Sequence, residues 1–90
     1  MTGKLRVLVV DDQETTRQAV EAILEFAADI ELTHQAADGS EALAVVEETQ
    51  PDVVLMDVKM PKMNGLEAIQ QIKAYWPEVK VIILTMYPNY

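Results

Sequence analysis

Three aspartates carry the clearest chemical signal in this sequence. Asp11 and Asp12 follow one apolar run, and Asp57 ends another. If these runs are neighbouring parallel strands, all three carboxylates converge at the rim where the strands end. Two like charges about 4 Å apart repel by about 4 kcal/mol at an effective dielectric near 20, so such a cluster calls for a cation. Magnesium fits best, because it takes oxygen ligands and keeps several of its waters.

Each aspartate taken singly has an ordinary interpretation. A carboxylate at a strand end often caps a helix or is a solvated loop residue, and for Asp11 or Asp52 alone that interpretation is preferred. The convergence of three carboxylates favours a site instead.

Composition removes several other kinds of site. The 90 residues include no cysteine and one histidine, which excludes a disulfide framework, a zinc site and a thiol nucleophile; His34 is expected to be a partly exposed strand residue. A net charge of -8 argues against direct nucleic-acid binding, which depends on Lys and Arg. No apolar run is long enough to span a bilayer and no secretory signal is visible, so we expect a soluble, cytoplasmic protein without membrane contact.

The elements that must position the aspartates alternate between apolar runs and helix-period segments, as in a parallel α/β sheet with right-handed crossover helices on both faces. We expect strands at Leu5–Val10, Ile30–Ala36, 53–56 and 79–84. We expect helices at about 14–28, at 41–49, and between an Asn64 cap and Pro77. The apolar stripes of the first and last helices are Ala19, Val20, Ile23, Leu24 and Ala27, and Leu66, Ile69 and Ile72.

Spacing excludes two further classes of site. A metal-dependent phosphatase with an aspartyl nucleophile needs its nucleophile and acid two residues apart after the first strand, and residues 11–14, which read DDQE, lack that spacing. Dinucleotide binding needs a glycine-rich turn after the first strand, where this chain has carboxylates.

Three stretches together resemble a known family. VLVVDDQET, VVLMDVKMPKMNGLEA and VIILTMY are similar to three consecutive landmarks of response-regulator receiver domains, in the same order and with similar spacing. The resemblance covers nearly the whole chain. It implies one receiver domain over residues 1–90, with a three-layer flavodoxin-like sheet in the strand order 2-1-3-4.

The resemblance also implies a role for each site residue. Asp57 is the phosphorylated aspartate. Asp11 and Asp12, with Asp57 and the backbone carbonyl of Lys59, bind Mg²⁺, Asp11 either directly or through water. Thr85 hydrogen-bonds a phosphoryl oxygen, although a strand-end threonine also commonly bonds its own backbone. The implied function is two-component phosphorelay signalling, in which a sensor histidine kinase phosphorylates a switch that is not an enzyme but assists its own phosphorylation and dephosphorylation.

The sequence departs from the family after its fourth strand. Receiver domains continue through a helix, a fifth strand ending in a lysine that pairs with the phosphoryl group, and a final helix, so we expect a truncated receiver. An uncovered fourth strand invites pairing, which predicts a homodimer through that edge; local packing in a marginally stable chain is the alternative. A second functional hypothesis is therefore an interaction module that keeps the receiver scaffold without phosphorylation.

Overall fold

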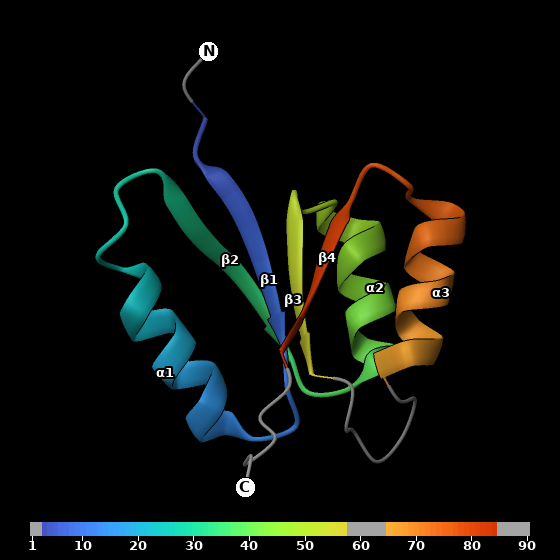
Figure 1. Ribbon diagram of the computed structural model, residues 1–90, viewed down its shortest axis with the longest axis horizontal. Helices are drawn as coiled ribbons and strands as arrows, with labels where there is room; N and C mark the ends of the chain where they lie inside the picture. The colour runs from blue at the N-terminus through green and yellow to red at the C-terminus, as the bar shows by residue number, and fades with distance from the viewer. Residues whose placement is uncertain (1–2, 58–64, 85–90) are drawn as a thin grey trace, which may run out of the picture.

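The computed structural model describes residues 3–57 and 65–84, which form a sheet between two helical layers (Figure 1). The strands are β1 (Leu5–Val10), β2 (Ile30–Ala36), β3 (Val53–Asp57) and β4 (Lys80–Leu84), paired in parallel in the order β2-β1-β3-β4. Helix α1 (Glu14–Leu24) lies on one face, and α2 (Gly39–Thr49) and α3 (Gly65–Tyr75) lie on the other. This arrangement confirms the predicted three-layer flavodoxin-like sheet.

Strand β1 holds the centre of the sheet because its side chains are apolar on both faces. Its last four residues are buried, as expected for a parallel strand between two neighbours. Val10 is paired with Ala36 of β2 and with Met56 of β3. The chain segments that follow Val10 and Met56 therefore leave the sheet at the same rim.

The main core lies between the sheet and the pair α2 and α3. Its fully buried members include Leu8, Met56, Ile72 and Val46. Helix α2 is set against this core by a cap at each end. The Asp38 side chain accepts a 2.8 Å hydrogen bond from the Glu41 amide, and the helix ends at a left-handed C-cap residue.

Helix α1 is shorter than predicted and buries none of its residues fully. The amides of Phe26 and Ala27 bond three residues back, to Ile23 and Leu24, so the helix tightens and ends before the predicted residue 28. Ile23 is 67% exposed, and the prediction that it faces inward is wrong. The reason is that α1 packs chiefly on β1 and β2, and the Ile23 side chain lies outside this packed face.

Helix α3 also differs from its predicted stripe. Its buried residues are Gly65, Ala68 and Ile72, with Ile69 partly buried, whereas Leu66 is 58% exposed and was wrongly predicted to be buried. Small residues at 65 and 68 bring the helix backbone close to the core, and this turns Leu66 outward. Asn64, the predicted cap, lies outside the described residues.

No helix in the described ranges combines the length and apolar character needed to cross a membrane.

Candidate functional site

The structure brings the three predicted carboxylates together at the carboxyl ends of the central strands. Asp57 is the last residue of β3, and Asp11 directly follows β1, its neighbour in the sheet. One carboxylate oxygen from each of Asp11, Asp12 and Asp57 lies within 4.8 Å of the others. Asp11 is buried, Asp57 is half-buried and Asp12 is exposed, so the cluster opens from the sheet rim toward solvent.

The carboxyl group of Asp11, the buried member of this cluster, has a raised pKa. Burial raises the pKa of its carboxyl group above the ordinary value of 3.8, and the negative charges of Asp57 and Asp12 raise it further. A hydrogen bond with the Asp57 side chain acts in the same direction, because only a protonated carboxyl can donate to another carboxylate. The Gln13 amide, which donates a 2.8 Å hydrogen bond to Asp11, partly opposes these effects.

The backbone at Asp11 is held by two further hydrogen bonds. The Asp11 amide donates to the Ala36 carbonyl of β2 at 3.0 Å, and the Arg17 guanidinium donates to the Asp11 carbonyl at 2.7 Å. Arg17 also donates to the Gln35 side chain at 3.2 Å, which ties α1 to β2 beside the cluster. The sequence pattern did not predict this role of Arg17, which lies in the helix expected at about 14–28. Every residue has a backbone carbonyl, so the sequence does not indicate which carbonyl a distant arginine side chain will bond.

This geometry suits a hard divalent cation. The cluster offers only oxygen atoms, which magnesium prefers, and it leaves an open side for water or a phosphate oxygen. A cation there would also remove the mutual repulsion of the carboxylates. Two members of the predicted site, the Lys59 carbonyl and the Thr85 hydroxyl, lie outside the described residues, and their roles stay predictions.

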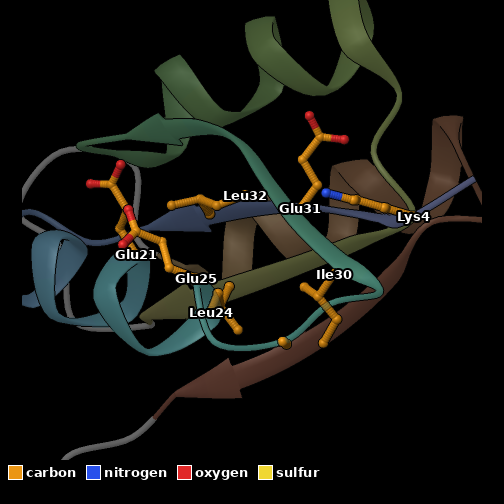
Figure 2. Close-up of a pocket in the computed structure, with 8 residues that line it drawn as sticks. Lys4, Glu21, Leu24, Glu25, Ile30, Glu31 and Leu32 are labelled. Carbon is orange, nitrogen blue, oxygen red and sulfur yellow. The ribbon is translucent and has the colours of Figure 1, made fainter.

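The cluster is separate from the cavity between α1 and β2. That cavity has a volume of about 280 Å³, and Figure 2 shows Glu21 and Glu25 extending from α1 at one end, with Leu24 and Ile30 along its wall. None of the three clustered aspartates lines it. The chemistry at the rim therefore does not depend on this cavity.

Comparison with known proteins is consistent with this geometry. The family model for the response regulator receiver domain matches residues 7–90. The transcriptional regulatory protein DegU of Brevibacillus brevis is 37% identical over 87 residues, which are 97% of this chain and 37% of that protein. The response regulator protein VraR of Staphylococcus aureus is 42% identical over 83 residues, which are 92% of this chain and 40% of that protein. The chain thus spans about two fifths of the length of these curated relatives.

Solved structures agree in fold. The response regulator domain of Thermotoga maritima CheB superposes with a TM-score of 0.87 at 38% identity, over 91% of this chain and 60% of that one. The signal receiver domain of the putative response regulator NarL from Mycobacterium tuberculosis superposes with a TM-score of 0.88 at 29% identity, over 97% and 70% of the two chains.

Proposed function

Because this chain belongs to the response regulator receiver domain family of two-component systems, we propose that Asp57 is its phosphoacceptor and that Asp11 and Asp12 help to bind the magnesium ion that the transfer requires. The observation that carries the proposal is the meeting of three carboxylates from two strand ends within 4.8 Å. In this family the fold supplies a signalling switch, and the donor is expected to be a histidine kinase.

The geometry supports one role for Asp57 and another, shared role for Asp11 and Asp12. Asp57 is half-buried and ends its strand, so its carboxylate lies at the sheet rim, where a phosphodonor can reach it. Asp11 and Asp12 each have a carboxylate oxygen within 4.8 Å of one from Asp57, and these three residues with the Lys59 carbonyl would hold Mg²⁺. The bound ion supplies positive charge that offsets the charge on the phosphoryl oxygens during transfer.

The transfer itself needs little covalent work from the protein. A carboxylate oxygen of Asp57 attacks phosphorus, the phosphorus–nitrogen bond of a phosphohistidine breaks, and the electron pair leaves with the imidazole, which takes up a proton. Water later attacks the acyl phosphate, releases inorganic phosphate and restores the Asp57 carboxylate. The Thr85 hydroxyl would donate a hydrogen bond to a phosphoryl oxygen while the group is present.

The relatives suggest an output for the signal. DegU is named a transcriptional regulatory protein, which favours a parent protein whose DNA contacts are made by another domain. The chain itself carries a net charge of -8, which disfavours direct DNA binding.

A labelling experiment tests the proposal. The chain is incubated with Mg²⁺ and a small acyl phosphate donor, and intact mass is compared among wild type, Asp57→Ala and Asp29→Ala. Asp29 is an exposed aspartate between α1 and β2, outside the cluster, so its replacement is a matched control. We expect one added phosphoryl group on wild type and on the control, and none on Asp57→Ala. If wild type gains no label, or if Asp57→Ala gains as much, Asp57 is not the phosphoacceptor.

We also propose self-association through β4, favoured by one observation. Among the described strands β4 forms an edge, and it exposes apolar side chains on both faces, with Ile82 at 52% and Ile83 at 47%. Sedimentation velocity over a concentration series tests this proposal against Ile82→Lys, which places a charge on the edge. A concentration-independent monomer for wild type would remove it.

A further inference from the structure

The outer surface of α2 and α3 contains a groove that the phosphoryl chemistry does not use. The two helices lie side by side on one face of the sheet (Figure 1). A cavity of about 440 Å³ is lined by residues of both. Its lining consists of Leu43, Ala44, Glu47, Gln71, Tyr75 and Trp76. These residues lie from the middle of each helix to its end, with Trp76 directly after α3, whereas the aspartate cluster lies at the carboxyl ends of the strands.

The groove forms because a small side chain, Ala44, lies beside two large aromatic ones, Tyr75 and Trp76. Ala44 is exposed and too small to fill the space between the helices. Tyr75 is 70% exposed, and its ring is tilted by 54° against that of Trp76, with ring centroids 5.8 Å apart. Tyrosine and tryptophan are the residues most enriched at binding hot spots, because they bury a large rigid surface. The groove therefore offers an apolar seat for a side chain from outside.

The charge at the groove indicates what kind of partner would complete it. Glu47 lines the groove, Glu48 follows it, and the last turn of α2 contains no basic residue. Within the described part of the chain, neither glutamate has a hydrogen-bond or ion-pair partner. Two basic side chains among the described residues bond to backbone carbonyls instead: Arg6 donates to the Gln50 carbonyl at 3.0 Å, and Lys73 donates to the Val79 carbonyl at 3.0 Å.

We propose that this groove binds a basic amphipathic segment of a partner protein, with one apolar side chain seated over Ala44 between the helices and a lysine or arginine beside Glu47. A second copy of the chain fits this groove poorly, because it would have to place a basic side chain beside Glu47, and the chain has 7 lysines and arginines against 15 acidic residues. Pairing at the apolar β4 edge makes no such demand. An enclosed small-molecule site fits less well too, since Ala44, Gln71 and Tyr75 are open to solvent. The interaction lies apart from Asp57 and does not require its phosphorylation.

The chain provides its own reporter for this binding. Trp76 is the only tryptophan, and it lines the groove, so its fluorescence responds to an occupant there. The probe is a short helical peptide of leucine and lysine at amphipathic spacing, titrated at physiological ionic strength. A second peptide in which glutamate replaces lysine tests the charge requirement. We expect a saturable blue shift of Trp76 emission with the lysine peptide and none with the glutamate peptide.

Two variants and one control separate the groove from general electrostatic attraction. Glu47→Lys should lower the affinity for the lysine peptide by about fivefold or more, since it replaces an exposed ion pair with repulsion. The same variant should raise the affinity for the glutamate peptide. Glu25→Lys makes the same charge change at the end of α1, on the opposite face of the sheet, and should change affinity by less than about twofold. Ala44→Phe, at an exposed position, should fill the groove and abolish peptide binding by calorimetry without altering the circular dichroism of the chain.

The possible outcomes are clearly divided. Loss of lysine-peptide binding in Glu47→Lys and Ala44→Phe, together with retained binding in Glu25→Lys, supports the proposal. An equal loss with Glu25→Lys would mean that net charge alone attracts the peptide, and this would overturn it. Binding of a small apolar dye that neither peptide displaces would overturn it as well, because the groove would then take small molecules rather than a protein segment.

Discussion

Replacing Asp11 by asparagine should stabilise the metal-free chain at neutral pH and weaken its response to magnesium. Asp11 is 5% exposed, and one of its carboxylate oxygens lies within 4.8 Å of an oxygen from each of Asp12 and Asp57. Asparagine keeps an oxygen that can accept the 2.8 Å hydrogen bond from the Gln13 amide. The substitution therefore removes a buried negative charge and changes little else.

The size of the effect follows from the spacing of the charges. At the 4.8 Å limit, two unit charges repel by about 0.9 kcal/mol at a dielectric of about 80 and by about 3.5 kcal/mol at a dielectric of about 20. Asp12 is exposed, so its repulsion of Asp11 lies near the lower value, and half-buried Asp57 lies nearer the upper one. After relaxation of the side chains, we expect the variant to gain about 1 to 3 kcal/mol in free energy of unfolding. For a domain of this size, each kcal/mol raises Tm by roughly 4 to 8 °C.

The pH dependence gives the same prediction an independent check. The pKa of Asp11 is raised in the folded state, so between its ordinary value of 3.8 and the raised value the folded chain binds more protons than the unfolded chain. Stability of the metal-free wild type should therefore fall as pH rises through this window, and the penalty should stay constant above it. The Asp11→Asn variant should lack this fall.

Urea denaturation with a chelator present, repeated from acidic to neutral pH, measures both quantities. Asp29→Asn removes a charge at an exposed site outside the cluster and should leave the stability nearly unchanged. With Mg²⁺ added, the Tm of wild type should rise more than that of Asp11→Asn. The reason is that a ligand stabilises the folded state more when the folded state binds it more tightly, and the variant has lost one carboxylate ligand. If Asp11→Asn is less stable than wild type without metal, the carboxylates do not repel one another as the geometry requires.

Three further substitutions test how the site and the core are held. Asp38→Ala should cost about 1 kcal/mol in urea denaturation because the Glu41 amide loses its 2.8 Å acceptor, whereas Asp38→Asn should be nearly neutral; equal losses would contradict the cap. Gln50 has a positive φ of 46°, where a side chain is unfavourable, so Gln50→Gly should raise the unfolding free energy by roughly 0.5 to 1 kcal/mol, and a loss would contradict this. Arg17→Met removes the 2.7 Å bond to the Asp11 carbonyl and should weaken Mg²⁺ binding, measured as a smaller Tm gain with Mg²⁺, while circular dichroism stays unchanged. Mg²⁺ affinity equal to wild type would show that Arg17 does not position the cluster.

Much of the fold could be predicted from the sequence because it depends on local patterns. The apolar runs predicted the strands to within one residue at each end, and the helical spacing of apolar residues predicted the three helices, although α1 ends four residues earlier than expected. The Asp38 cap is likewise a local feature, because an aspartate directly before a helical pattern is a preferred N-cap residue. The positions of Asp11, Asp12 and Asp57 at strand ends were also visible, because a strand stops where its apolar run stops.

Other features depend on which elements become neighbours, and only the tertiary structure decided them. Ile23 and Leu66 were predicted to be buried, but burial requires a covering element, and the described elements leave both exposed. The Arg17 bond to the Asp11 carbonyl and the groove beside Ala44 form only where separate elements pack together. The spacing of residues in the sequence therefore does not predict them. The sequence by itself placed carboxylates at the ends of two strands, whereas the pairing of β1 with β3 brought them within reach of one cation. The physical reason is that residue type and periodicity determine local conformation, while the distance between remote side chains is determined by strand order and register.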